Sequence, residues 1–222
     1  MRTIRTYKLR RSRITPLQQE ALLHHAPEFL LDPELSPIDL AEILKKTYFV
    51  VEVGFGMGEA TWQLAERQPD TAVLALDLHT PGIGRLVAHL HEHSIDNVKI
   101  LEQDAITVLE EKIQDSSIDA LRLFFPDPWP KKRHIKRRFI SAENLDLLAS
   151  KIKVGGSLHI ATDWDDYAEM CEELITVHPL WQAIPKSDLC QPEQRPKTKF
   201  EMRGISEGRR ITDLVAERIQ GL

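Results

Sequence analysis

Short apolar runs alternate with segments of helical periodicity from residue 48 onward. Apolar runs bounded by turn residues predict buried strands, whereas apolar positions three and four apart predict helices. We predict strands at residues 48–53, 72–78, 98–101, 118–125 and 157–162. We predict helices at residues 59–67, 84–93, 105–113, 135–152 and 165–177. This alternation is typical of an α/β fold with a doubly wound, mostly parallel sheet.

Both flanks of this pattern are less regular. Ser36 followed by Pro37 predicts a further helix before the first strand, with Ser36 as N-cap and Pro37 at the first helical position. The apolar residues between 211 and 219 fit a helical period and fit an edge strand equally well. The local pattern leaves both interpretations of this tail open.

Composition suits a single domain with a sizeable core, since 42% of the 222 residues are hydrophobic and 28% are charged. No apolar run approaches the length of a membrane span, and no apolar region follows the basic N-terminus as in a secretory signal. Cys171 and Cys190 lack the spacing of a metal site, which favours reduced thiols. We therefore predict a cytoplasmic protein without a membrane partner. Nothing here decides between a monomer and a homodimer.

Positive charge is concentrated in two acid-free segments, although the net charge is −5. Residues 1–13 and residues 131–138 each hold six Lys or Arg, which leaves 17 basic and 34 acidic residues elsewhere. Such asymmetry indicates a local polyanion-binding surface on an acidic body, although any one basic run is commonly just a solvated face. The second segment lies at the start of the predicted helix 135–152, where cations oppose the helix dipole, and nucleic-acid phosphates would neutralise them.

Three histidines, His89, His91 and His93, alternate along the predicted helix 84–93. Neighbours in this spacing point to different faces, so the three cannot jointly bind a metal ion. We predict surface or packing roles for them and no metal site.

A glycine-rich turn follows the first strand, with Gly54, Gly56 and Gly58 after Glu52. Glycines between a strand and a helix let a ligand approach the backbone closely. A dinucleotide fingerprint needs a small residue at position 59, but Glu59 would repel a pyrophosphate. The pattern instead suits a cofactor that carries a positive sulfonium and no phosphate.

Two further acids, Asp77 and Asp104, follow the second and third predicted strands. In an open parallel sheet these strand ends border the crevice where ligands bind, so the carboxylates are placed to meet a ribose and an adenine amino group. Each is also a plausible helix cap. The fourth strand leads into Pro126-Asp127-Pro128-Trp129-Pro130, where the prolines stiffen a loop that holds Asp127 and Trp129 at the same edge.

Several of these segments resemble the bacterial tRNA (guanine-N7-)-methyltransferase family from about residue 35 to the C-terminus. The resemblance is carried by residues 52–58, the run 126–138, Ala161-Thr162-Asp163-Trp164, and Thr198-Lys199-Phe200-Glu201. Asp77 stands where many relatives have glutamate. The resemblance implies transfer of a methyl group from S-adenosylmethionine to N7 of guanosine 46 in the variable region of tRNA, in a methyltransferase fold whose tail is a late antiparallel edge strand.

The resemblance also assigns roles to individual residues. Glu52, Gly54, Gly56, Gly58, Asp77, Asp104 and Asp127 would bind the cofactor, and Asp127 would be catalytic. Lys131, Asp163, Thr198, Lys199, Phe200 and Glu201 would bind the guanosine. Arg133, His134, Ile135, Lys136, Arg137 and Arg138 would bind RNA. We divide the chain into a basic arm, residues 1–15, and a single methyltransferase domain, residues 16–222. For the arm, two behaviours stay open: it is flexible, or it becomes ordered when it binds RNA.

Two other functions fit parts of the pattern. A strand-end loop with Asp127 before Pro128 also serves enzymes that methylate exocyclic amino groups of bases in DNA or RNA. A non-catalytic RNA-binding protein would retain the fold without binding the cofactor. The nature of the methylated nucleoside separates the first from a guanine-N7 enzyme, and binding of S-adenosylhomocysteine separates the second.

Overall fold

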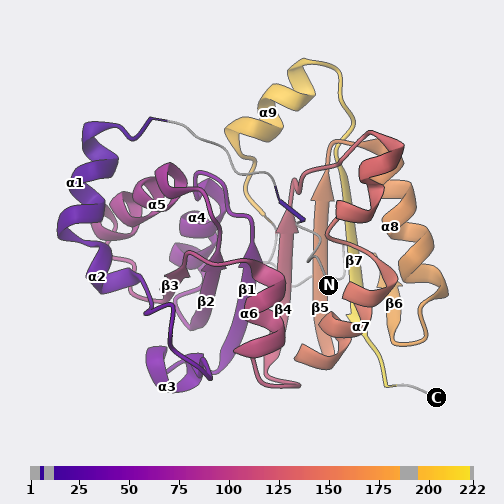
Figure 1. Ribbon diagram of the computed structural model, residues 1–222, viewed down its shortest axis with the longest axis horizontal. Helices are drawn as coiled ribbons and strands as arrows, with labels where there is room; N and C mark the ends of the chain where they lie inside the picture. The colour runs from indigo at the N-terminus through magenta and orange to yellow at the C-terminus, as the bar shows by residue number, and fades with distance from the viewer. Residues whose placement is uncertain (1–5, 8–12, 186–194, 221–222) are drawn as a thin grey trace.

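A seven-stranded mixed sheet forms the centre of the described chain (Figure 1). The structure is a computed structural model, which describes residues 6–7, 13–185 and 195–220. Its strands are β1 (Tyr48–Val53), β2 (Thr71–Leu76), β3 (Val98–Leu101), β4 (Ile118–Phe124), β5 (Ile152–Thr162), β6 (Trp181–Ile184) and β7 (Thr212–Arg218). They follow the order β3-β2-β1-β4-β5-β7-β6. The first five pair in parallel, whereas β7 is antiparallel to both of its neighbours.

This topology confirms the predicted fold class. The tail is a strand and not a helix, because β7 pairs with β5 through Ser157 to Thr162. β7 is not the edge strand itself, because it lies between β5 and β6, and the sequence did not predict β6. Its burial pattern has only Trp181 fully buried, so it lacks the continuous apolar run that marks the inner strands.

Helices cover both faces of the sheet. They are α1 (Pro16–His24), α2 (Ala26–Phe29), α3 (Leu40–Leu44), α4 (Glu59–Arg67), α5 (Thr80–Glu92), α6 (Ala105–Glu111), the 3-10 helix η1 (Lys132–Arg137), α7 (Ala142–Lys151), α8 (Asp165–Val177) and α9 (Lys199–Ser206). Successive strand residues point to opposite faces. Val50 and Val73 therefore pack with α1, α4 and α5, while Val51 and Leu74 pack with α6, α7 and α8. Burial on both faces explains why these strands read as continuous apolar runs.

The predicted helix 135–152 is wrong in its first half. Residues 132–137 form η1, and α7 begins only at Ala142, after Ser141. The hydroxyl of Ser141 accepts a hydrogen bond from the backbone N–H of Asn144 at 3.2 Å, which is the N-cap interaction that starts a helix. The basic segment therefore lies outside the long helix, and the expected cost against its dipole does not arise.

The predicted helix start at Ser36 is also wrong. Helix α3 begins at Leu40, and Asp39 is its N-cap, accepting from the backbone N–H of Glu42 at 3.0 Å. Ser36 instead donates its hydroxyl to the carbonyl of Glu111 at 3.2 Å, and the bond from Ser36 to Pro37 is cis. Local composition placed the helix correctly to within one turn but chose the wrong cap.

Most of the basic arm lies outside the described residues, including Arg2, Arg5, Lys8, Arg10 and Arg11. Within the described part of the arm, the carbonyl of Thr6 accepts a hydrogen bond from the indole of Trp129 at 3.1 Å. The start of the chain thus touches the loop that leads into the second basic segment.

The described part of the chain also bears on the expectations for membrane spans and for the two cysteines. No helix there is long and apolar enough to cross a bilayer. Cys171 is buried and forms no disulfide, and Cys190 lies outside the described residues.

Candidate functional site

The carboxyl ends of five parallel strands lie side by side. Val53 at the end of β1 pairs with Leu76 of β2 and Leu123 of β4. Leu76 and Leu123 pair in turn with Leu101 and Ile160 on the outer strands. Five acids lie close to this line in the sequence. Glu52 comes one residue before it, Asp77 one residue after it, Asp104 and Asp163 three residues after it, and Asp127 four residues after it. The register therefore brings the predicted acids to one edge of the sheet.

The glycine turn after β1 is held in place by Asp77. All three of its glycines have left-handed backbones, with φ values of 74°, 59° and 75° at Gly54, Gly56 and Gly58. Side chains other than glycine adopt this conformation only at a cost of about 1–2 kcal/mol. Asp77 accepts from the backbone N–H of Gly56 at 2.8 Å, and from Leu78 and His79 at 2.7 and 2.9 Å. Asp77 thus shapes the turn, and its predicted contact with a ribose stays a prediction.

Gly82 is a site residue that sequence analysis missed. A Cβ atom at this position would lie 1.9 Å from the carbonyl oxygen of Gly56, so the first turn of α5 packs directly on the glycine turn. The sequence offered only the pair Pro81-Gly82, which indicates a helix start and not a close approach between two backbones.

Glu52 is a buried acid at this edge, and its pKa is strongly raised. It is only 2% exposed, and burial raises its pKa to about 7, against the opposing effects of Arg122 and of a hydrogen bond from Thr61. Its Oε1 accepts from Thr61 at 3.1 Å, whereas its buried Oε2 has no hydrogen-bond partner within the described residues. A buried carboxylate oxygen without a donor is unfavourable. A ligand that brings a positive charge or an N–H group to this oxygen fits the residues present.

Asp104 caps a helix. Its Oδ1 accepts from the backbone N–H and the hydroxyl of Thr107, at 3.1 and 3.2 Å, at the start of α6. The capping role considered for this residue is therefore confirmed. These bonds involve one carboxylate oxygen, and a contact between Asp104 and an adenine amino group stays a prediction.

The loop that carries Asp127 is bracketed by two strained residues. Phe125 and Trp129 have φ values of 53° and 43°, which are rare for side chains of this size. The N–H of Phe125 donates to the carbonyl of Ala161 at 2.7 Å, and the guanidinium of Arg138 donates to the carbonyl of Pro128 at 2.9 Å. These bonds hold a costly backbone conformation in place around the half-buried Asp127.

Arg138 differs from the rest of the predicted RNA-binding run. Its side chain is 2% exposed, forms an ion pair with Asp166, and lies 5.1 Å over the ring of Tyr167. Together with its bond to Pro128, these contacts fix the loop to α8. The prediction that Arg138 contacts RNA is not supported by this position, because its guanidinium is already enclosed.

The remainder of the basic run faces outward. Lys131, Lys132, Arg133, Ile135 and Lys136 are exposed, while His134 and Arg137 are half-buried. The guanidinium of Arg137 lies 5.0 Å over the ring of Trp129, and His134 meets the same ring edge-on at 5.7 Å. The indole of Trp129 is thus covered in part by these side chains.

Helix α9 lies at the carboxyl edge, at the end toward which the arrows of β4 and β5 point (Figure 1). Thr198 is its N-cap, accepting from Glu201 at 3.2 Å. The N–H of Lys199 donates to Glu59, directly after the glycine turn, at 2.8 Å. The exposed ring of Phe200 lies 5.3 Å from Phe125. Three of the predicted guanosine-binding residues therefore lie above the turn and the loop that surround the other acids.

Glu201 and Asp163 each have an arginine partner that sequence analysis missed. Glu201 is 5% exposed and pairs with Arg195, which also donates to Asp213 at 2.7 Å. Asp163 pairs with Arg209. The burial of Glu201 favours a role in holding α9 against β7 over direct contact with a substrate. Asp163 and Arg209 are 46 residues apart and meet only in the fold. Arg195 and Glu201 are 6 residues apart, but no motif in the sequence announces their pairing.

Comparisons with known proteins agree with this arrangement. Residues 46–214 match the family described as "Putative methyltransferase". A tRNA (guanine-N(7)-)-methyltransferase of Streptomyces avermitilis is 43% identical over 99% of this chain and 77% of its own length. Proteins of the same name from Neisseria meningitidis serogroup C and Methylobacillus flagellatus are each 41% identical, over 99% and 98% of this chain and 92% of their own lengths.

Solved structures share the fold at low identity. The 16S rRNA methyltransferase KamB superposes with a TM-score of 0.59 at 16% identity, over 84% of this chain and 95% of that one. A 16S rRNA (adenine(1408)-N(1))-methyltransferase of Catenulisporales acidiphilia, solved with its cosubstrate SAM, has a TM-score of 0.55 at 17% identity, over 86% of this chain and 92% of that one. These similarities establish the architecture alone. Because the named relatives align along almost its entire length, the chain belongs to the tRNA (guanine-N(7)-)-methyltransferase family.

Proposed function

We propose that this protein transfers the methyl group of S-adenosylmethionine to N7 of guanosine 46 in the variable region of tRNA, in the cytoplasm. The observation that carries the proposal is the 41–43% identity to tRNA (guanine-N(7)-)-methyltransferases over nearly the whole chain. The convergence of the acids on one sheet edge supports it independently, because that is where ligands bind in open parallel sheets.

Four carboxylates are proposed to hold the methyl donor. The buried Glu52 offers an unpartnered oxygen to the positive end of the molecule. Asp77 and Asp104 follow the next two strands, where a ribose and an adenine would lie along the edge. Gly54, Gly56 and Gly58 keep side chains away from this surface, and Asp127 borders it from β4.

The chemistry needs little beyond alignment and electrostatics. S-adenosylmethionine, when bound, supplies a methyl group on a positively charged sulfur. Guanine N7 already has an in-plane lone pair, so no general base has to remove a proton. Transfer of that methyl group to N7 would leave the positive charge of the sulfur on the guanine ring. Asp127 is proposed to orient the base through its N–H groups, and Asp127 and Asp163 to stabilise the charge that the ring acquires.

The RNA is proposed to bind beside this edge. Residues 131–137 form a largely exposed cationic strip next to the Asp127 loop, and Thr6 meets that loop at Trp129. Cationic side chains of this kind contact phosphates and position the nucleic acid without reading its sequence. Arg138 supports the strip from beneath, by holding the loop.

Incubation of an unmodified tRNA transcript with labelled S-adenosylmethionine tests the proposed reaction. After digestion we expect label only in 7-methylguanosine, and no label in a transcript with adenosine at position 46. Recovery of N6-methyladenosine, or 7-methylguanosine formed equally in the substituted transcript, contradicts the proposal. The absence of any transfer together with no binding of S-adenosylhomocysteine would favour a non-catalytic RNA-binding protein.

Replacing Asp127 by alanine separates catalysis from binding. We expect Asp127→Ala to lower kcat at least about a hundredfold, as removal of one group that stabilises transition-state charge does in other enzymes. Affinity for tRNA should stay within about threefold, because the cationic strip is untouched. Single-turnover kinetics and filter binding measure the two effects. Asp165→Ala removes an exposed acid from the start of α8 and serves as the control. Equal losses in both variants would remove Asp127 from the reaction.

Cofactor affinity is expected to depend on pH through Glu52. Its pKa is about 7 in the folded protein, against an ordinary value of 4.5, so the carboxylate is protonated below neutral pH and loses its attraction for a cation. Affinity for S-adenosylhomocysteine, measured by calorimetry, should fall as the pH drops through about 7, by up to roughly tenfold per pH unit.

Glu52→Gln tests this origin, because any titration of the ligand itself remains. The pH dependence should flatten in this variant. Its folding should survive at neutral pH, since a raised carboxyl pKa means that ionisation of Glu52 lowers stability as pH rises from 4.5 toward 7. A wild-type pH profile in Glu52→Gln refutes the assignment of Glu52 to the cofactor.

Mutations of exposed and of buried cations in the basic run should have different effects on tRNA binding and on thermal stability. Changing Lys132, Arg133 and Lys136 to glutamine should weaken tRNA binding and reduce the log–log salt slope by up to about 0.9 for each lost phosphate contact. Arg138→Lys should leave the slope unchanged but lower the thermal midpoint, because it loses contacts to Pro128 and Asp166. An unchanged slope in the triple variant excludes this strip from the RNA surface.

A further inference from the structure

Two groups of histidines and glutamates flank α5, away from the proposed reaction site. The argument that His89, His91 and His93 point to different faces holds for His91, but His89 and His93 are four residues apart and share a face. One group is His89, Glu92 and His93, and the other is His25, Glu28 and His91. In each, one potential ligand atom per residue lies within 4.8 Å of the others.

We propose that His89, Glu92 and His93 bind a divalent transition metal ion of the Zn²⁺ type, and that Glu66 supports the site from α4. Two imidazoles and a carboxylate form a donor set that zinc accepts, with water able to complete four ligands. Pairs of histidines at positions i and i+4 of a helix present their rings on one side, as chelation requires.

The ring geometry lets the two imidazoles converge. Both lie on the indole of Trp62, at 5.2 Å and 20° for His89 and at 4.5 Å and 29° for His93. Their own centroids are 6.2 Å apart with an angle of 48°. At that separation they lie next to each other on the indole and are tilted, and one nitrogen of each ring lies within 4.8 Å of the other and of a Glu92 oxygen.

His89 provides an unsatisfied nitrogen at this position. Its Nδ1 is buried without a hydrogen-bond partner within the described residues, and it lies 3.9 Å from Oε2 of Glu92. Two ligands of one tetrahedral zinc ion are roughly 3.4 Å apart, so a small side-chain adjustment suffices.

Glu66 adds a second carboxylate from the neighbouring helix. Its Oε1 lies 3.2 Å from Nδ1 of His93. A carboxylate bonded to one ring nitrogen orients the imidazole and makes the other nitrogen a better metal ligand. Trp62 and Glu66 are four residues apart on α4, opposite His89 and His93 on α5. An ion here would fasten the two helices together.

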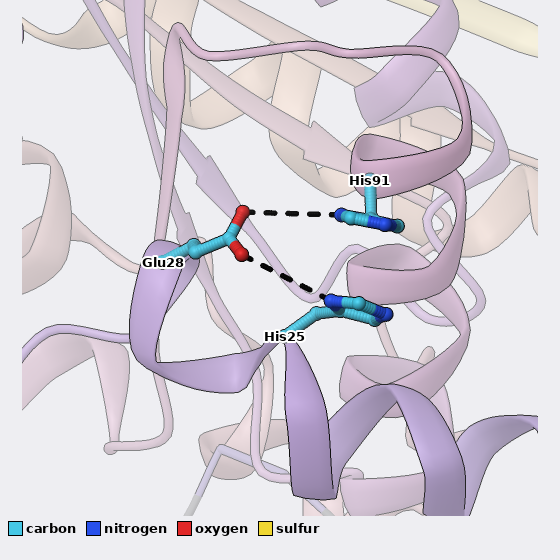
Figure 2. A group of neighbouring side chains, drawn as sticks. All are labelled: His25, Glu28 and His91. Atoms are coloured by element: carbon cyan, nitrogen blue, oxygen red, sulfur yellow. Dashed lines mark ion pairs between the residues drawn. The ribbon is translucent and has the colours of Figure 1, made fainter.

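The group on the other face of α5 has a different ring arrangement, with His25 and His91 stacked face to face beside Glu28 (Figure 2). The rings of His25 and His91 are stacked at 3.5 Å with an angle of 15°, and each Nδ1 lies 3.9 Å from an oxygen of Glu28. Lone pairs in the planes of parallel rings run parallel, so an ion between them would lie outside both planes. This group therefore supplies a matched control of similar composition.

The proposed ion would be structural. His93 and Glu66 lie at the C-terminal ends of α5 and α4, whereas Asp77 and the glycine turn lie before the N-terminal ends of these helices. Binding should therefore stabilise the fold without taking part in methyl transfer, and its outcome is independent of the proposed function.

Zinc titration of the full-length chain by calorimetry tests the site. We expect one Zn²⁺ per chain, with affinity reduced at least about tenfold in His93→Asn and in Glu92→Gln, and unchanged in His91→Asn. Saturating zinc, at about a hundredfold over Kd, should raise the thermal midpoint of the wild type by roughly 5–10 °C and that of His93→Asn by much less. No binding by the wild type, or loss in His91→Asn with retention in His93→Asn, overturns the proposal.

Tryptophan fluorescence gives a second readout at the same position. Cu²⁺ bound between His89 and His93 would contact the indole of Trp62 and quench its emission. We expect the saturable part of the quenching to disappear in Trp62→Phe and in His93→Asn, and to persist in His91→Asn. Quenching that is equal in all four proteins contradicts an ion at this site.

Discussion

The hydrogen bond from the backbone of Gly56 to the carboxylate of Asp77 joins the ends of β1 and β2 and gives the site its shape. Because three of the five residues in the turn are left-handed glycines, the turn has little intrinsic preference for this path, and the acceptor at the end of β2 selects it. Gly82 then brings α5 onto the same turn without a side chain in between. The strand register brings the other acids to the same place, since parallel strands that end together present the residues that follow them along one edge of the sheet.

Charge is arranged in two zones around this edge. Glu52 is buried and acids follow the other strands, so the interior of the site favours a cationic ligand and a developing positive charge on a base. Outside it, η1 exposes cations that suit a polyanion. Arg138 connects the two zones. It belongs to the basic run in sequence, but its side chain is buried beneath the run and holds the Asp127 loop in place. A methyltransferase acting on RNA requires both zones next to each other.

Sequence alone predicted the parts of this account that depend on local pattern. Apolar runs located the five parallel strands. It failed where a residue's role depends on distant partners. The burial of Arg138 beside Asp166, the pairing of Asp163 with Arg209, and the approach of Gly82 to Gly56 all join segments far apart in the chain. The helix start at Ser36 failed for a local reason, because Asp39 offered a competing cap three residues later.

A crystal structure of the protein with S-adenosylhomocysteine tests most directly whether these acids form one binding site. The account predicts that the amino acid end of the ligand lies against the unpartnered Oε2 of Glu52, with its ribose beside Asp77 and its adenine beside Asp104. Its sulfur should face Asp127. Density for the ligand at any other surface, or a ligand at this edge that leaves Oε2 of Glu52 without a donor, would contradict the account.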